Sequence, residues 1–308
     1  MHTQEQFDLI ILGGGAAGLT AGIYASRAKL STLILNEGMV GGQMILTYEI
    51  ANYPGYENIS GYQLSMSMKK QAETFGCVIK QNITIDQLDI QGEIKSVKLS
   101  NGNVYTSKAI ILATGGSSRN LNVKGEDEFK GRGISYCATC DGDFYTGQDI
   151  IVVGGGNSAL EEAVSLTKYA KTVTIVHQFD YFQAFEHAVE MAQKNEKISF
   201  ILNSTITGFH GDEKLKYVEI KNLKTDEISK KEIDGVFIFI GYAANTSKLK
   251  SHIAINQYGE IITDETMATN VPGVFAAGDV RAKKIRQIAT AVSDGAIAAV
   301  SAIEYVQK

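Results

Sequence analysis

Short apolar runs recur along the chain, and glycines follow several of them directly. Residues 8–12 (Asp-Leu-Ile-Ile-Leu) form the first run, and residues 149–153 (Asp-Ile-Ile-Val-Val) form a near copy of it. Apolar runs of this length, without polar alternation, are typical of parallel strands buried on both faces of a sheet. An alanine-rich segment at 19–30 suits a helix, and another apolar run follows at 32–35. The pattern therefore predicts strand–turn–helix units of a doubly wound α/β fold.

Further elements are expected between and after these units. In the first half we expect a helix at 61–75, strand and connection at 78–90, strands at 94–99 and 104–108 around the hairpin signal Asn101-Gly102, and a buried strand at 110–116. In the second half we expect strands at 199–202, 217–223 and 236–240, then a short strand at 273–279 and a helix at 285–305.

The last part of the chain contains too few elements to form a domain alone. Its strand, glycine turn and helix need a sheet to join, and the N-terminal domain is the natural host. Polar stretches at 117–121 and 241–246 suit two linkers. The predicted organisation is two doubly wound dinucleotide-binding-type domains, the second (117–245) inserted into the first (1–116 and 246–308).

The first glycine-rich turn, Gly13-Gly14-Gly15-Ala16-Ala17-Gly18, has glycines in the G-x-G-x-x-G places. The first glycine allows the turn, the second lets backbone approach a pyrophosphate, and the third lets helix and strand pack closely. Phosphates would lie at the helix N-terminus, where free N–H groups point outward. Glu37, just past the next strand, is placed to accept a hydrogen bond from a ribose hydroxyl. Strand, turn, helix and acid together predict a dinucleotide site.

The same unit recurs without a gap, at an offset of 141 residues. Residues 149–160 align with residues 8–19, and residues 173–176 align with residues 32–35. Self-similarity at a fixed spacing indicates duplicated structural units. Each half of the chain should therefore carry its own nucleotide-type crevice.

Composition narrows the class of protein. The 308 residues carry a net charge of −5, with 44% hydrophobic and 20% charged residues, so nucleic acid and anionic membranes are not expected partners. No apolar run approaches the roughly 20 residues of a membrane span. The first residues lack the basic and apolar regions of a secretory signal. Three cysteines in a long chain are not a disulfide scaffold, which favours a reducing cytoplasm.

Two of the cysteines stand in the segment Cys137-Ala138-Thr139-Cys140-Asp141-Gly142, just before the second glycine turn. Thiols two residues apart can close and reopen a disulfide, and the Asp141 carboxyl group can hold the required proton. The alternatives are half of a zinc site or two reduced core cysteines, but structural zinc commonly takes two such pairs and the chain has no second pair. We therefore expect a redox dithiol and no metal site. We expect Cys77 to be a plain buried thiol.

Along essentially its whole length the chain resembles the low-molecular-weight thioredoxin reductase family, a branch of the flavoproteins with two dinucleotide-binding domains. Beside the glycine turns, the shared motifs are Gly41-Gly42-Gln43, Asn52-Tyr53-Pro54-Gly55, Ala113-Thr114-Gly115, Gly278-Asp279-Val280, Arg286-Gln287 and Ser293-Asp294-Gly295. Several of these are common to many flavoproteins. The dithiol followed by Asp-Gly, just before the second glycine turn, is specific to this family.

The resemblance implies an FAD-dependent thioredoxin-disulfide reductase that forms a homodimer. Cys140 would take electrons from the flavin, Cys137 would attack the disulfide of thioredoxin, and Asp141 would protonate the departing thiolate. Asp279 would meet the ribityl chain of FAD, and Gln287 would lie near the flavin ring. The implied FAD contacts are Gly13, Gly15, Ala16, Ala17, Gly18, Glu37, Gly42, Gln43, Asn52, Ala113, Thr114, Gly115, Asp279, Arg286 and Gln287.

The strand after the second glycine turn departs from the NADPH-dependent members of the family. Those members carry a His-Arg-Arg cluster there, with another arginine four residues on, and guanidinium groups suit the 2′-phosphate of NADPH. Here the places read His177-Gln178-Phe179 and Gln183, so all three arginines are missing. Gln178 also stands opposite Glu37 in the repeat, so the acid that would bind both ribose hydroxyls of NADH is absent.

These departures leave several hypotheses for the electron donor. A ferredoxin-dependent subset of the family lacks the same arginines, and reduced ferredoxin is our preferred donor. NADPH or NADH is the alternative, because Gly154, Gly156 and Ala159 remain and Gln178 or Asp180 could bond one hydroxyl. A flavin redox sensor and a dithiol oxidase are further alternatives.

Docking of an iron–sulfur donor would need a charge match near the flavin. The candidate cations are Lys283, Lys284 and Arg286 near the flavin-binding C-terminal motif, and Arg27 and Lys29 on the first helix.

Overall fold

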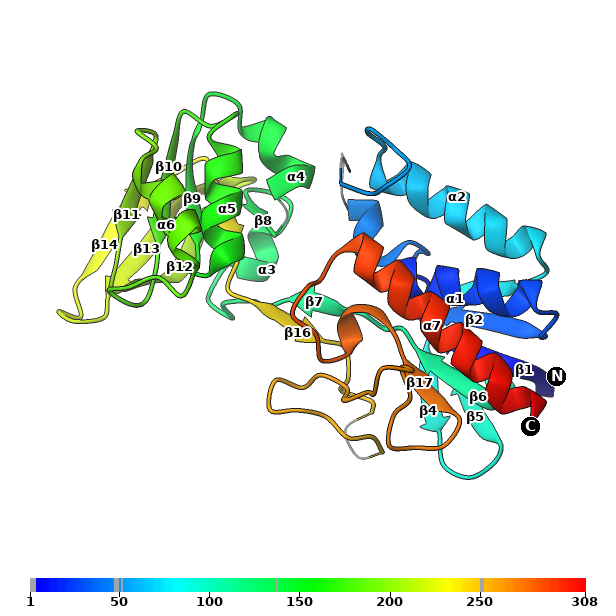
Figure 1. Cartoon of the computed structure of the whole chain (residues 1–308). Helices are drawn as coiled ribbons and strands as arrows, with labels where there is room; N and C mark the ends of the chain where they lie inside the picture. Colours follow the sequence, from blue (N-terminus) through cyan, green and yellow to red (C-terminus); the bar gives the residue numbers. More distant parts are fainter. Residues whose placement is uncertain (1–3, 47–49, 51, 137, 250–251) are drawn as a thin grey trace. The chain divides into compact units, whose positions relative to one another are not determined.

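The computed structural model describes residues 4–46, 50, 52–136, 138–249 and 252–308, which divide into two compact units (Figure 1). Unit 1 contains Met1–Ser117 and Ala243–Lys308, and unit 2 contains Ser118–Tyr242. Unit 2 is thus inserted into the chain of unit 1. Unit 1 combines a mixed sheet with helices and unit 2 a parallel sheet with helices, so the predicted α/β fold class is confirmed.

Unit 1 is built on a sheet with the strand order β3-β2-β1-β6-β5-β4, and β17 also pairs with β6. The strands are β1 (Gln4–Leu12), β2 (Thr32–Asn36), β3 (Val78–Gln81), β4 (Ile85–Asp89), β5 (Lys95–Leu99), β6 (Val104–Leu112) and β17 (Val274–Ala276). β1 pairs in parallel with β2 and β6, whereas β4, β5 and β6 form an antiparallel meander. β17 joins β6 in parallel, so the segment after the insertion completes the N-terminal sheet.

One predicted break in this sheet is wrong. The sequence suggested separate strands at 104–108 and 110–116, but the backbone forms one continuous strand, β6. The first half of β6 pairs with β5 and has partly covered side chains, whereas residues 110–112 pair with β17 and are fully buried. The change from an alternating to a wholly apolar pattern therefore reflects a change of neighbours within one strand.

The described helices of unit 1 are α1 (Ala16–Arg27), α2 (Gly61–Thr74) and α7 (Ile288–Gln307), with 3₁₀ turns η1 (Gly42–Leu46) and η3 (Gly278–Val280). α1 packs against both α2 and α7 (Figure 1). A Cβ atom at Gly295 would lie 2.2 Å from the carbonyl oxygen of Ala17, so a glycine is needed where α7 approaches α1. α7 is long and apolar enough to cross a membrane by length and composition. One face of α7, which includes Ala291, Ala298 and Ala302, is buried within unit 1.

Unit 2 is built on a parallel sheet with the strand order β11-β10-β9-β15-β8. These strands are β8 (Ile134–Ser135), β9 (Asp149–Val153), β10 (Thr172–Val176), β11 (Ile198–Ile201) and β15 (Gly235–Ile238). The helical segments are α3 (Glu126–Phe129), α4 (Ala138–Asp141), η2 (Gly142–Tyr145), α5 (Asn157–Leu166) and α6 (Glu186–Gln193). A separate antiparallel sheet contains β12 (Ser204–Gly211), β13 (Leu215–Asn222) and β14 (Ile228–Glu232). The sequence patterns did not predict β8, β12, β14 or α6.

The two connections between the units pair with each other. β7 (Gly116–Ser118) and β16 (Tyr242–Ala244) form a two-stranded ribbon. The Arg119 N–H donates to the Gly241 carbonyl (3.0 Å), and the Asn245 N–H donates to the Gly115 carbonyl (2.9 Å). The segments expected to be plain linkers, 117–121 and 241–246, thus satisfy part of their backbone polar groups by pairing.

Candidate active site

The first glycine turn is required by the packing of unit 1 itself. Gly13 has a φ of +109°, and a Cβ atom there would lie 2.2 Å from the Ala113 carbonyl oxygen. A Cβ atom at Gly18 would lie 1.9 Å from the Gly13 carbonyl oxygen. These two glycines therefore bring β1, β6 and α1 into contact, as the dinucleotide motif predicts.

Gly15 is different, because its side-chain position faces open space. The nearest atom to a Cβ there is the Gly42 Cα, at 3.9 Å. Gly15 is also the N-cap of α1, and no side chain caps that helix end. The first N–H groups of α1 are therefore available to a ligand, which is the arrangement that binds phosphate groups. The structure thus brings Gly13, Gly15, Gly18 and Gly42 together at one end of α1.

The end of β2 presents two polar side chains beside this turn. Asn36 Oδ1 accepts a hydrogen bond from the Gly14 N–H (2.8 Å). Glu37, the residue that we selected from the sequence, forms an ion pair with Lys248 Nζ (2.7 Å) and accepts a hydrogen bond from the Ile85 N–H (3.2 Å). Asn36 was missed, although it is the last residue of β2 and directly precedes the predicted acid. Ribose binding by Glu37 stays a prediction, and Asn36 becomes a second candidate.

Polar residues from distant parts of the sequence meet elsewhere in unit 1. Asn52 Nδ2 donates to Gln287 Oε1 (3.0 Å), which joins the segment after η1 to the start of α7. Gln43 Nε2 donates to the Gly116 carbonyl (3.2 Å), and Thr114 Oγ1 donates to the Asn245 carbonyl (2.9 Å). The structure therefore places Asn52 beside Gln287, and Gln43 beside the strand end that carries Ala113, Thr114 and Gly115.

Asp279 lies in η3. Its carboxylate oxygen Oδ1 is buried and has no hydrogen-bond partner among the described residues. Burial raises the pKa of this carboxyl group, and the charges of Lys283 and Arg286 oppose that rise. Lys283 Nζ lies 4.0 Å from Oδ1 but 2.8 Å from the Asp294 carboxylate, which also accepts a hydrogen bond from the Gly278 N–H. An unpaired buried oxygen is costly unless a ligand hydroxyl completes it. Together with the open glycine turn, it fits FAD.

The cations proposed for docking a donor are mostly engaged within unit 1. Lys283 is paired with Asp294, and Arg286 forms an ion pair with Glu260. The Arg27 guanidinium lies over the Phe75 ring, 5.4 Å from its centroid. Of the three cations at 283–286, only Lys284 is exposed. The cluster is therefore weaker as a docking surface than its sequence suggests.

Asp141 ends α4 in unit 2. Cys137 lies outside the described residues, and so does the side chain of Cys140. The Ser135 hydroxyl donates a hydrogen bond to Asp141 Oδ2 (2.5 Å). Burial, and then the charge of Asp141, raise the pKa of the Tyr145 hydroxyl, which places Tyr145 near this carboxyl group. The predicted acid is thus held by the strand that precedes the dithiol.

The second glycine turn keeps its shape, but aromatic side chains surround it. Gly154 has a φ of +141°, and a Cβ atom at Gly156 would meet nothing closer than the Gln183 carbonyl oxygen at 3.9 Å. The His177 ring lies directly over Gly155, where a Cβ atom would be 2.4 Å from it. His177 also contacts Phe179 edge-on and stacks on Phe182.

Asp180, the second candidate for binding a ribose, is held by a cation. Its carboxylate pairs with Lys224 Nζ at 3.0 Å, and both side chains are exposed. Phe179 stacks on Tyr181, with ring centroids 5.4 Å apart. The strand end at which the sequence lacks the three arginines therefore carries aromatic rings and one surface ion pair.

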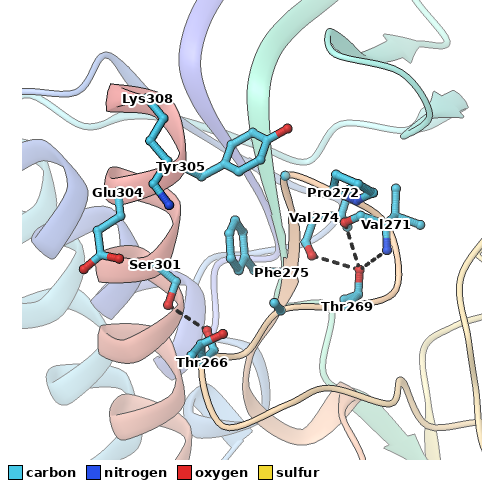
Figure 2. Close-up of a pocket in the computed structure, with 12 residues that line it drawn as sticks. Thr266, Thr269, Val271, Pro272, Val274, Phe275, Ser301, Glu304, Tyr305 and Lys308 are labelled. Carbon is cyan, nitrogen blue, oxygen red and sulfur yellow. Dashed lines mark hydrogen bonds between the residues drawn. The ribbon is translucent and has the colours of Figure 1, made fainter.

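Two other findings bear on the search for sites. Among the described residues there is no cluster of three or more His, Cys, Asp or Glu side chains that could hold a metal ion. Figure 2 shows a cavity of about 270 Å³ between β17 and the end of α7. The hydroxyl groups of Ser301 and Thr269 in its wall donate to the carbonyls of Thr266 and Val274, so these groups are used in the fold.

Comparison with known proteins agrees with this geometry. Residues 7–295 match the family model described as pyridine nucleotide-disulphide oxidoreductase, so the chain belongs to that family. It is an FAD-dependent oxidoreductase.

Particular relatives narrow the comparison. The thioredoxin reductase of Peptoclostridium acidaminophilum is 44% identical over 99% of this chain and 98% of its own. The crystal structure of Lactococcus lactis thioredoxin reductase has 43% identity and a TM-score of 0.84, covering 98% of this chain and 99% of its own. A ferredoxin-flavin thioredoxin reductase from Clostridium acetobutylicum is also similar, with 29% identity and a TM-score of 0.53 over 98% of each chain.

Proposed function

We propose that this protein is a thioredoxin reductase whose electron donor is reduced ferredoxin and not NADPH. The relatives named thioredoxin reductase and the Cys-Ala-Thr-Cys-Asp-Gly segment support the first part. The residues of the second nucleotide crevice support the second part, and they are the main support for the proposed donor.

Thioredoxin would be reduced by thiol–disulfide exchange. When bound, FAD supplies the electron pair that reduces the Cys137–Cys140 disulfide to a dithiol. The Cys137 thiolate attacks one sulfur of the thioredoxin disulfide, and Asp141 gives a proton to the departing thiolate. The Cys140 thiolate then attacks the Cys137 sulfur, which closes the Cys137–Cys140 disulfide and releases the second thioredoxin sulfur as a thiolate that takes up a proton from solvent. Two electrons and two protons have then passed to thioredoxin.

The missing arginines argue against NADPH as the electron donor. Each hydrogen bond to a charged group contributes about 1.5–3 kcal/mol. Three absent guanidinium contacts therefore remove at least about 4.5 kcal/mol, or roughly a thousandfold in affinity for a 2′-phosphate. Phe179 and Gln183 cannot replace them, and the nearby cation Lys224 is already paired with Asp180. A protein donor that delivers electrons directly to the flavin needs no such site.

The donor can be tested by mixing the oxidised holoenzyme anaerobically with NADPH, NADH or reduced ferredoxin and following flavin absorbance. We expect rapid bleaching with ferredoxin, followed by thioredoxin reduction, and slow bleaching with either nucleotide. Rapid bleaching by micromolar NADPH would overturn the proposed donor. Efficient reduction by NADH would instead support the second candidate, a nucleotide-dependent reductase, which the open space at Gly156 favours.

Gly156→Ala provides a sharper version of this test. The added methyl group has room in the fold, but it would occupy the place of a pyrophosphate. With ferredoxin as donor, turnover should stay within about twofold of the wild type, because the crevice is not used. If a nucleotide is the donor, its KM should rise by at least about tenfold, equivalent to about 1.4 kcal/mol.

The order of the two cysteines is tested by trapping. Cys140→Ser should accumulate a mixed disulfide between Cys137 and thioredoxin, because the resolving thiol is gone. If only Cys137→Ser gives this adduct, the roles are reversed. Loss of thioredoxin reduction in Cys137→Ser would argue against the flavin sensor and the dithiol oxidase, because the sensor predicts no turnover with any thioredoxin. The proposal also includes a cytoplasmic location, supported by the low cysteine content, and a homodimer, supported by the family resemblance and measurable by sedimentation.

A further inference from the structure

We propose that Ser135 is a positioning residue for the proton donor Asp141. The Ser135 hydroxyl holds the carboxyl group of Asp141 in the orientation that protonates the departing thioredoxin thiolate. This inference rests on the proposed thiol–disulfide exchange and adds to it a residue outside the Cys-Ala-Thr-Cys-Asp-Gly segment.

Ser135 is fixed by the sheet of unit 2. β8 pairs in parallel with β15, with Ile134 opposite Val236 and Ser135 opposite Phe237. The Val236 N–H donates to the Gly133 carbonyl (2.8 Å) just before this strand. The Ser135 side chain is 4% exposed, so its hydroxyl is held by buried strands.

Asp141 has a less rigid local setting. It ends α4, which has only four residues, and η2 follows directly. A single helical turn does not fix a carboxyl group by itself, because such a short helix is marginal without external contacts. The Ser135–Asp141 contact supplies that constraint. Ser135 donates to Oδ2 at an oxygen–oxygen distance of 2.5 Å, which leaves Oδ1 to carry the proton.

If Ser135 positions Asp141, the effect of losing Ser135 on the exchange rate should depend on the leaving group. In the first exchange step the Cys137 sulfur bonds to one sulfur of the thioredoxin disulfide, the sulfur–sulfur bond breaks, and the departing alkyl thiolate takes the Asp141 proton. An acidic aryl thiol departs as a stable thiolate and needs no proton. Loss of proton-donor positioning should therefore slow the first reaction and spare the second.

The experiment uses the dithionite-reduced holoenzyme in single turnover with two substrates. One is oxidised thioredoxin, and the other is a single-cysteine thioredoxin capped with 2-nitro-5-thiobenzoate, which docks alike but releases an aryl thiolate. Ser135→Ala should slow the reaction with oxidised thioredoxin by about tenfold, a fraction of the gain typical of acid catalysis, and leave aryl thiolate release unchanged. Ser135→Thr, which keeps the hydroxyl, should recover most of the lost rate.

Ser204→Ala is the matched control. Ser204 lies in the same unit, is 2% exposed, and donates to the Leu202 carbonyl at 2.9 Å, away from the dithiol segment. It should leave both rates unchanged. In an Asp141→Asn background, Ser135→Ala should cause no further loss, because its effect passes through that carboxyl group.

Three outcomes would overturn the inference. These are equal slowing of both substrates by Ser135→Ala, failure of Ser135→Thr to recover the rate while it remains folded, or a full additional loss in the Asp141→Asn background. Failure of the wild-type enzyme to reduce thioredoxin is a distinct result, because it would reject the proposed function before any variant is compared.

Discussion

Burial sets the chemistry of Cys77. The residue is 5% exposed beneath α1, and burial raises the pKa of its thiol to about 11. At about pH 8 only roughly one molecule in a thousand would carry the reactive thiolate. The prediction of a plain buried thiol is confirmed.

Alkylation should therefore distinguish Cys77 from the other two cysteines. After reduction, native protein treated with iodoacetamide should be modified at Cys137 and Cys140 but not at Cys77, as measured by peptide mass spectrometry. Unfolding in denaturant should make Cys77 react as well. Rapid modification of native Cys77 would contradict its assigned environment. Cys77→Ala should keep thioredoxin reduction within about twofold, because the thiol has no part in the exchange.

His177 gives unit 2 a pH-dependent stability. Burial lowers the pKa of His177, although a hydrogen bond with the Tyr181 backbone opposes this effect. Below the unfolded pKa of about 6.5, the unfolded chain therefore binds a proton that the folded chain does not. The free energy of unfolding should fall as pH decreases through this window, and the stabilising effect should be complete above it.

The corresponding measurement is the thermal midpoint of the protein at about pH 7.5 and about pH 5.5. We expect His177→Gln to reduce the difference between the two midpoints, because glutamine does not titrate. The exposed His187→Gln is the control and should leave that difference unchanged. An unchanged difference in His177→Gln would show that other groups cause the acid sensitivity.

At the scale of elements, two glycines of the first strand–turn–helix unit have different roles: one is needed for folding and the other for binding. A Cβ atom at Gly18 would meet the Gly13 carbonyl oxygen at 1.9 Å, and backbone cannot move away without disrupting β1 or α1. A Cβ atom at Gly15 has 3.9 Å of clearance, but it would point into the space where we expect the cofactor to bind.

The two alanine variants should therefore fail in different ways. Gly18→Ala should destabilise unit 1 by about 2 kcal/mol or more, measured by denaturant unfolding. Gly15→Ala should unfold at nearly the same denaturant concentration as the wild-type apoprotein but bind FAD at least about tenfold more weakly, measured by titration. Equal destabilisation by both variants would show that Gly15 is also a packing residue.

Local patterns predicted the elements that a short window of sequence can specify. The glycine turns, α1, α5 and the buried strands were found because their glycines and apolar runs are adjacent in the chain. The contact of Asn52 with Gln287 and the ion pair of Glu37 with Lys248 join segments more than two hundred residues apart. Such pairs have no local signal, because both partners are ordinary polar residues. β14 was missed for a related reason, since Ile228–Glu232 is mostly polar and exposed at the edge of its sheet.

At the scale of the whole molecule, unit 2 has the cores needed to fold alone. One core cluster includes Leu160 and Phe237, and another includes Phe209 and Val236. We expect an isolated 118–242 fragment to show α/β circular dichroism and a cooperative thermal transition. Ile150→Asp, which places a charge at a fully buried position, should abolish that transition. A fragment without a cooperative transition would show that unit 2 needs unit 1 in order to fold.

The ribbon of β7 and β16 also bears on how such a chain can change over generations. Because Arg119 and Gly241 are hydrogen-bonded neighbours, the inserted segment enters and leaves unit 1 at one place. A gene segment that encodes 118–242 could therefore be exchanged for that of a relative while the sheet and α7 of unit 1 keep their sequence. Under the proposed function, one recombination would transfer the dithiol and the nucleotide crevice together. Such an exchange could change the electron donor of the enzyme while the flavin-binding residues of unit 1 stay the same.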